Sequence, residues 1–137
     1  MVKTRFAIAA DAALLLAKSA AQVPDNHTLV APTLLRSQVL AHLYKAVRDG
    51  DLDKREADVR LDYLRGLKIR LLGDRVLQRY AWNIASQLDW RDTYRAEYIA
   101  VTQLQADALV TLDPDLAAAA WSFVRVGSVE DLLTTIA

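Results

Sequence analysis

The sequence predicts an α/β fold in which a central parallel sheet of four to five strands is flanked by helices. Short apolar runs, of the length of buried strands, alternate along the chain with longer stretches of helical periodicity. This alternation is typical of a parallel sheet covered on both faces. The 137 residues contain no internal repeat and no linker, so we expect one domain over residues 1–137. Hydrophobic residues make up 53% of the chain and cysteine is absent, which excludes a disordered chain, thiol chemistry and Cys-ligated zinc.

The first half of the chain is expected to contain three strands and three helices. Residues 6–10 are apolar and too few for a helix, and a similar run at 28–31 is ended by Pro32. Glu56 follows Asp53 at the spacing of a capping box. The expected elements are a strand at 6–10, a helix at 12–21, a loop at 23–27, a strand at 28–31, a helix from 33 to Gly50, a helix that starts at Asp53, and a half-exposed strand at 67–71.

The second half is expected to add three helices and two strands. Its aromatic residues follow helical spacing, so we interpret them as core residues rather than as stacking platforms. The expected elements are a helix that starts at Gly73-Asp74 and buries Val76, Leu77, Tyr80, Ala81, Ile84 and Leu88, a helix that carries Tyr94, Tyr98, Val101 and Leu104, a strand at 108–112, an alanine-rich helix at 116–121, and a last strand at 123–126 before the C-terminal tail.

The charges cancel overall but are unevenly distributed. Seventeen Lys and Arg residues balance seventeen Asp and Glu residues, so no bulk positive field draws the protein toward nucleic acid. The net charge is +1 over residues 1–35, +4 over 36–95 and −5 over 96–137. Any contact with nucleic acid therefore has to come from a local patch, and solvated faces of different sign are the simpler interpretation of the gradient.

The N-terminus resembles a secretion signal because Lys3 and Arg5 precede an apolar run at residues 6–17. Asp11 lies in the middle of that run, and a charge there is costly for membrane insertion. We interpret the run as folded core, and we expect a cytoplasmic protein without a membrane segment.

Two aspartates follow predicted strands. Asp11 closes the strand at 6–10, and Asp113 closes the strand at 108–112. Ligands of parallel sheets bind at the carboxyl ends of the strands, so the two carboxylates converge if these strands are neighbours. Carboxylates without His or Cys beside them suit Mg²⁺ or Mn²⁺, which activates water and stabilises charge on a phosphate. The alternative is that each aspartate only caps the helix that follows it.

Four motifs, in this order, resemble the PIN-domain family and in particular the VapC-type toxins of bacterial toxin–antitoxin pairs. They are a strand that ends in an Asp opening a helix, a strand followed by proline and a helix, a helix with an Ala-x-Tyr motif, and a strand that ends in Asp. They lie at residues 9–15, 30–40, 94–100 and 109–116, and together they span nearly the whole chain. The resemblance implies a PIN-like domain and a metal-dependent endoribonuclease with three or four acids around Mg²⁺ or Mn²⁺.

Carried over by position, the resemblance makes Asp11 the first acid and Asp113 the last, as catalytic and metal-binding residues. The second acid of the family is replaced by Gln38, and the third by Arg95. Asp92, one helical turn before Arg95, and Asp115 are candidates to supply the missing carboxylate, whereas Glu97 is expected to point elsewhere. Gln38 keeps an oxygen that can accept a hydrogen bond from a metal-bound water.

The charge reversal at Arg95 suggests two arrangements. In the first, Arg95 occupies the acidic pocket as a built-in cation that pairs with Asp11 and Asp113. In the second, Arg95 turns to solvent and Asp92 takes part in metal binding. A guanidinium about 4 Å from a bound cation is repulsive by roughly 4 kcal/mol at an effective dielectric constant of 20, so the two arrangements differ strongly in metal affinity.

Two functions follow. The first is a VapC-like endoribonuclease whose activity is weakened by Gln38 and Arg95, and the second is a non-catalytic PIN-like binding protein that keeps the fold and its partner surface. The resemblance also implies an RNA substrate, a small antitoxin partner and a homodimer.

Overall fold

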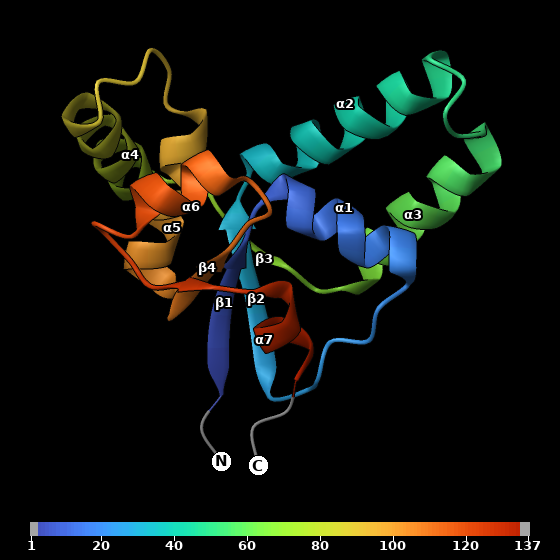
Figure 1. The fold of residues 1–137 in the computed structure, drawn as a ribbon, viewed down its shortest axis with the longest axis horizontal. Helices are drawn as coiled ribbons and strands as arrows, with labels where there is room; N and C mark the ends of the chain where they lie inside the picture. The colour runs from blue at the N-terminus through green and yellow to red at the C-terminus, as the bar shows by residue number, and fades with distance from the viewer. Residues whose placement is uncertain (1–2, 135–137) are drawn as a thin grey trace.

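The computed structural model describes residues 3–134, in which five parallel strands form one sheet. The order of the strands across the sheet is β3-β2-β1-β4-β5 (Figure 1). The predicted α/β class and the predicted parallel sheet are therefore confirmed. The strands are β1 (Thr4–Ile8), β2 (His27–Pro32), β3 (Arg70–Leu72), β4 (Ala108–Val110) and β5 (Val126–Gly127).

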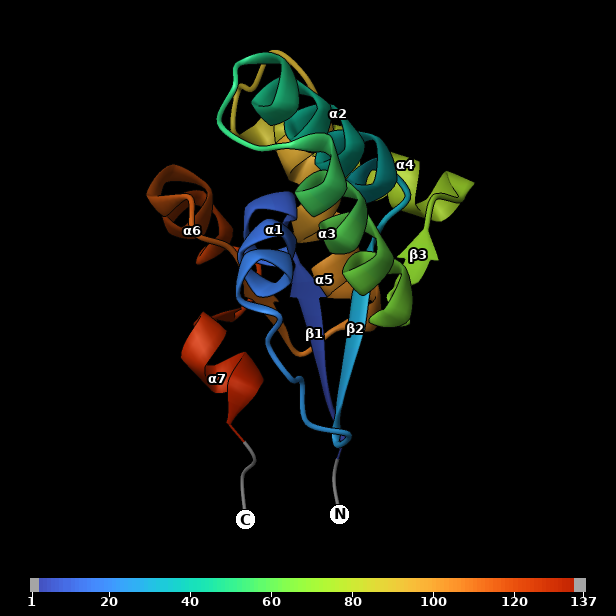
Figure 2. The same cartoon turned by 90° about the vertical axis from the view of Figure 1, so that its right-hand side faces the viewer.

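The helices cover both faces of the sheet. The chain runs from β1 through β2 to β3 in one direction, then returns to β4 and β5 on the other side of β1. Because such crossovers are right-handed, the reversal places α1 to α3 on one face and α4 to α6 on the other (Figures 1 and 2). The helices are α1 (Ala10–Ser19), α2 (Leu34–Arg48), α3 (Lys54–Gly66), α4 (Arg75–Gln87), α5 (Tyr94–Gln105), α6 (Pro114–Ala120) and α7 (Val129–Leu133).

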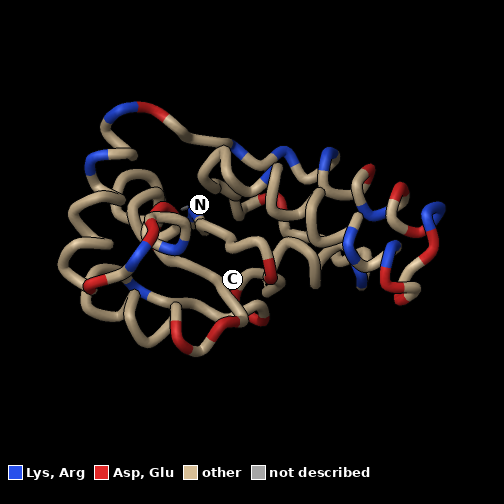
Figure 3. Tube along the Cα trace, turned by 90° about the horizontal axis from the view of Figure 1, so that it is seen from above, with Lys and Arg blue, Asp and Glu red and all other residues tan. Residues whose placement is uncertain are grey.

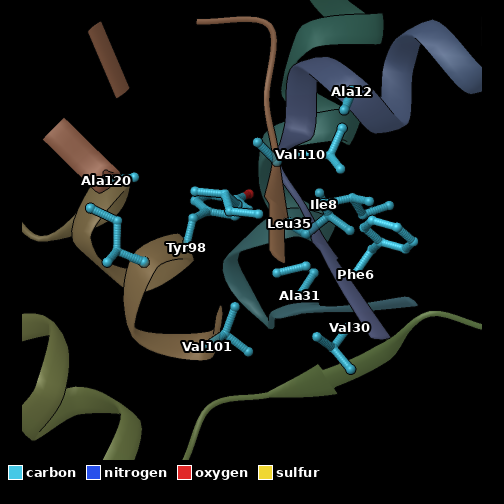
Figure 4. Packing of buried hydrophobic residues seen from close by; sticks show 14 of the residues in the cluster. Phe6, Ile8, Ala12, Val30, Ala31, Leu35, Tyr98, Val101, Val110 and Ala120 are labelled. Atoms are coloured by element: carbon cyan, nitrogen blue, oxygen red, sulfur yellow. The ribbon is translucent and has the colours of Figure 1, made fainter. Parts of the chain in front are cut away.

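The core lies around the two central strands. Ile8 of β1 and Leu109 of β4 are fully buried, and α5 presents Ile99 and Val101 to the sheet, also without exposure. Figure 4 shows Tyr98 projecting from α5 into this cluster toward the strands. Burying one side chain of this size contributes about 1.5–3 kcal/mol, so these apolar runs fix the positions of β1 and β4 side by side.

Local signals in the sequence explain where several helices begin. Asp53 accepts a hydrogen bond from the Glu56 amide (2.7 Å), and Asp74 accepts one from the Leu77 amide (2.9 Å), so each aspartate caps the helix that follows. Gly73 precedes the second cap, and a Cβ there would lie only 2.6 Å from Oγ1 of Thr33. Close packing at this turn therefore requires glycine.

The end of the chain differs from the prediction. The expected strand at 123–126 is instead a turn, because the amides of Phe123 and Val124 both donate to the carbonyl of Ala120, and β5 starts only at Val126. Helix α7 was not predicted. Its signal is a capping box in which the side chains and amides of Ser128 and Asp131 bond reciprocally, with an Asp where the motif usually has Glu or Gln.

Three smaller corrections concern single residues. Asp11 lies in the first turn of α1 rather than before the helix, because α1 already begins at Ala10. Val76 and Tyr80, which we expected on the buried face of α4, are 45% and 40% exposed. The buried face is instead formed by Leu77, Ala81, Ile84 and Ala85.

Helices α2 and α3 form an arm on which both signs of charge are interspersed (Figure 3). Four ion pairs lie within these two helices or directly after them, and each links residues three or four apart. Exposed pairs of this kind contribute about 0–1 kcal/mol each, so they mainly keep the arm solvated. Across residues 3–134, no helix is long and apolar enough to cross a membrane.

Candidate metal centre at the carboxyl ends of the strands

The strand order reverses between β1 and β4, which are hydrogen-bonded neighbours. In open parallel sheets, ligands bind outside the carboxyl ends of the strands at such a switch point. Asp11 follows β1 and Asp113 follows β4, so the topology brings these two aspartates to one edge of the sheet. The condition for convergence, that the two strands are neighbours, is met.

Three groups hold the carboxylate of Asp11. Its Oδ1 accepts a hydrogen bond from the amide of Ala12 (2.6 Å), and its Oδ2 accepts from the amide of Leu112 (3.2 Å) and the hydroxyl of Thr111 (3.1 Å). The side chain is half-buried at the start of α1, where the helix dipole also favours a negative charge. These contacts fix the orientation of the carboxylate.

Asp113 has the structural role that the capping interpretation predicted. Its Oδ1 accepts hydrogen bonds from the amides of Asp115 (2.9 Å) and Leu116 (3.3 Å), which caps α6. Its own amide donates to the hydroxyl of Thr111 (3.1 Å). Only one carboxylate oxygen is used in these bonds, so capping and cation binding are compatible at this residue.

Thr111 is the residue that sequence reasoning missed. Its hydroxyl donates to Asp11 and accepts from the amide of Asp113, so it links the two aspartates. A hydroxyl can do both at once because it carries one donor and two lone pairs. The available signal was a threonine at the end of a buried strand, two residues before an aspartate.

Gln38 and Tyr98 form a neutral hydrogen bond beside these acids. The Tyr98 hydroxyl donates to Oε1 of Gln38 (2.5 Å). Burial raises the pKa of Tyr98 above its ordinary value, and the negative charges of Glu97 and Asp11 raise it further. The hydroxyl therefore stays protonated at neutral pH, and its hydrogen bond occupies one lone pair of the Gln38 oxygen.

Arg95 does not occupy the acidic pocket. Its guanidinium carbon lies 4.4 Å from the ring centroid of Trp90, and within residues 3–134 it forms no ion pair with Asp11 or Asp113. The prediction of a built-in cation is thus wrong for this structure, and the alternative, in which Arg95 is exposed, describes its position. A cation–π contact of this kind contributes about 0.5–1 kcal/mol at an exposed site, which favours this position of the side chain.

Asp92 and Asp115 are not assembled with the other acids. Asp92 is exposed and accepts a hydrogen bond from the Tyr94 amide (3.2 Å), and Asp115 is exposed in the first turn of α6. In the part of the chain that the structure describes, no three His, Cys, Asp or Glu side chains are grouped as a metal site. Asp11 and Asp113 are the two candidate acids that the topology brings to one edge of the sheet.

Glu97 lies closer to this region than we expected. It is half-buried on α5, and burial raises the pKa of its carboxyl group. Its negative charge acts on Tyr98, as that of Asp11 does. Spacing alone does not predict this position, because the residue between two motif positions on a helix is expected to face away.

The order of the strands and the placement of the helices give a PIN-like fold, as the sequence motifs predicted. The structure is similar to that of PAE2754 from Pyrobaculum aerophilum, with 22% sequence identity, coverage of 96% of each chain and a TM-score of 0.72. It is also similar to a chain of VapBC2 from Rickettsia felis, whose crystal structure was solved bound to a DNA fragment from the VapBC2 promoter. That match has 11% identity, covers 90% of this chain and 98% of the other, and has a TM-score of 0.62.

No protein-family model matches the sequence, and no curated protein matches it either. At these identities the structural similarities establish the fold alone.

Proposed function

We propose that the protein is a metal-dependent endoribonuclease of the VapC-like type in which metal affinity is weakened. The observation that carries the proposal is the link between Asp11 and Asp113 through Thr111 at the switch point of the sheet. Helix capping alone accounts for Asp113, but it does not account for an Asp11 carboxylate held by groups 100 and 101 residues away.

The two aspartates fit a Mg²⁺ or Mn²⁺ ion that is only partly held by protein. Mg²⁺ usually keeps several waters and binds through one or two carboxylates together with a substrate phosphate. Asp11 and Asp113 would hold the ion, which would supply water activation and charge stabilisation at a phosphodiester. With two carboxylates instead of three or four, we expect the ion to bind weakly to the free protein and more tightly when RNA is present.

The chain's own residues position the site and set its charge. The three hydrogen bonds to Asp11 hold its carboxylate in place, and the Thr111 hydroxyl accepts from the backbone amide of Asp113. Tyr98 and Gln38 supply a neutral polar pair at this edge. The second lone pair of the Gln38 Oε1 atom can still accept a hydrogen bond from a metal-bound water, as the sequence suggested.

A non-catalytic binding protein is the second candidate. It is favoured by the hydrogen bond between Tyr98 and Gln38 and by the contact between Arg95 and Trp90. Both give the residues at the two acid positions a role other than metal binding. Both candidates keep the fold and differ in whether a phosphodiester is cut.

We also propose a small antitoxin as partner, with an apolar groove of about 500 Å³ between α2, α3 and β3 as its docking site. Leucines form much of its lining, and its charged residues are the basic Arg36, Arg65 and Lys68, of which Arg65 pairs with Asp62. The groove therefore suits an acidic amphipathic helix.

A homodimer is supported by Trp82, whose side chain is 71% exposed, because aromatic residues are enriched at protein interfaces. The mass in solution of the wild type and of Trp82→Arg tests this proposal.

The function is tested by titrating Mg²⁺ and Mn²⁺ calorimetrically, with and without single-stranded RNA, and by assaying RNA cleavage. We expect millimolar metal binding that RNA strengthens, with cleavage, and we expect Asp11→Asn to abolish both. RNA binding without metal uptake or cleavage would favour the non-catalytic candidate instead.

A further inference from the structure

We propose that Arg95, held against Trp90, binds a phosphate of single-stranded RNA beside the acidic site. The proposal rests on the proposed function, because it assumes that RNA is the macromolecule at this edge of the sheet. The residue that replaces the third acid of the family then contacts the RNA strand directly instead of contacting a metal.

Trp90 is a fixed platform. It lies just after α4, where its amide donates to the carbonyl of Ala85 (2.9 Å), and its partly buried side chain packs against the core. Asp89, immediately before it, has a positive φ of 56°, which turns the chain sharply at the end of the helix. The ring therefore gives the Arg95 guanidinium a preferred position.

The stacked guanidinium keeps its donors available. Arg95 is exposed, and across residues 3–134 it pairs with no carboxylate. A guanidinium has five N–H donors in a planar fork that matches the oxygens of a phosphate. A cation with unused donors and a preferred position is preorganised for an anion.

Arg95 is also next to the proposed centre. It lies in the first turn of α5, three residues before Tyr98, and side chains three apart on a helix are neighbours, about 5–6 Å between Cβ atoms. The Tyr98 hydroxyl in turn contacts Gln38 on α2. Arg95 therefore shares a helix with Tyr98, whose hydroxyl reaches the surroundings of Asp11, while its own guanidinium extends to Trp90.

The surrounding segment favours RNA over an acidic protein. Between α4 and the first turn of α5, the aromatic and basic residues Trp90, Arg91, Tyr94 and Arg95 are interleaved, and Asp89 and Asp92 lie among them. Tyr94 is 53% exposed, which corrects the expectation that the aromatics of this helix are core residues. Interleaved cations and exposed rings are typical of surfaces that bind single-stranded nucleic acid, where rings stack on bases and cations contact phosphates. An acidic peptide would use the cations and leave the exposed ring of Tyr94 without a partner.

The proposal is tested by fluorescence anisotropy with a short labelled single-stranded RNA in EDTA, so that neither metal nor cleavage contributes. We expect Arg95→Gln to weaken binding roughly tenfold and to reduce the salt slope by about one. Trp90→Leu should weaken binding with the charge retained, whereas Trp90→Phe should keep most of it. Arg55→Gln, at an exposed position on α3, is the matched control and should bind as the wild type does.

Equal RNA affinities for Arg95→Gln and Arg55→Gln would overturn the inference. The same anisotropy measurement with labelled polyglutamate tests for an acidic protein as the ligand. The inference would also be overturned if Arg95→Gln weakened binding to polyglutamate but not to RNA. Thermal melting of each variant identifies any loss that comes from unfolding. The proposed function is judged separately. Metal-dependent cleavage that Asp11→Asn abolishes, with unchanged RNA affinity in Arg95→Gln, would retain the function and remove the inference. RNA binding that depends on Arg95, without cleavage, would retain the inference and remove the proposed nuclease function.

Discussion

The hydroxyl of Thr111 lies 3.1 Å from Oδ2 of Asp11, although the two residues are 100 positions apart in the chain. The contact exists because β1 and β4 pair in parallel, so that the residues just beyond both strands meet at one edge. The same hydroxyl accepts from the amide of Asp113, and each aspartate is therefore held in relation to the other.

We expect Thr111→Val to destabilise the fold by about 1–2 kcal/mol, because it removes a hydrogen bond to a charged acceptor and leaves the Asp113 amide without its partner. Valine has the shape of threonine, so packing is preserved. Urea unfolding measures the change, and Thr111→Ser serves as the control that restores the hydroxyl. A Val variant as stable as the wild type would show that the link contributes nothing to folding.

Asp113 combines capping with charge, and two substitutions separate these roles. Asn is as good a helix cap as Asp, so Asp113→Asn should leave the free energy of unfolding nearly unchanged while it weakens metal binding. Asp113→Ala should weaken metal binding as well and cost about 0.5–2 kcal/mol of stability. The measurements are thermal melting and calorimetric titration. If Asn and Ala destabilise equally, the cap seen at α6 is not important for stability.

The fold was largely predictable because the determining signals are local. The apolar runs of β1 and β4, the Asp caps at 53 and 74 and the alternation of strands with helices are all visible over a few residues. The prediction failed where local signals compete. Phe123 and Val124 are β-prone, yet they continue the turn after α6.

The candidate site was predictable only as far as topology decides it. The convergence of Asp11 and Asp113 follows from strand order, whereas the positions of Arg95 and Thr111 depend on side-chain contacts between distant segments. Charge complementarity predicted an Arg95 paired with the aspartates. The guanidinium instead contacts the ring of Trp90, five residues earlier in the chain, and none of the spacing rules that we applied predicts this contact.

Glu97 predicts a pH dependence of stability. Burial raises the pKa of Glu97 in the folded protein above its value in the unfolded chain. Between these two pKa values, the folded state therefore binds more protons than the unfolded state. Its contribution to stability is therefore fully present below the unfolded pKa and is lost as the pH rises through the folded pKa. We expect Glu97→Gln to flatten the stability profile on the acidic side of neutrality. Urea unfolding over this pH range tests it, with exposed Glu130→Gln as the control. Parallel profiles for wild type and Glu97→Gln would contradict it.

Restoring the two replaced acids should strengthen metal binding. In Arg95→Asp with Gln38→Glu, a positive charge becomes negative and a neutral side chain becomes charged, at positions next to the proposed centre. One unit charge about 4 Å from a cation changes its binding by roughly 4 kcal/mol at an effective dielectric constant of 20, so even a fraction of this effect gives a tenfold gain.

Calorimetric titration with Mg²⁺ and Mn²⁺ measures that gain, and the single variants separate the contributions of the two positions. Asp11→Asn added to the double variant is the control, and it should remove the binding again. Gln38→Glu also places a carboxylate opposite the Tyr98 hydroxyl, which can still donate to it because the raised pKa of Tyr98 keeps the hydroxyl protonated. Unchanged metal affinity in the double variant would contradict the prediction and would mean that positions 38 and 95 do not adjoin a cation site.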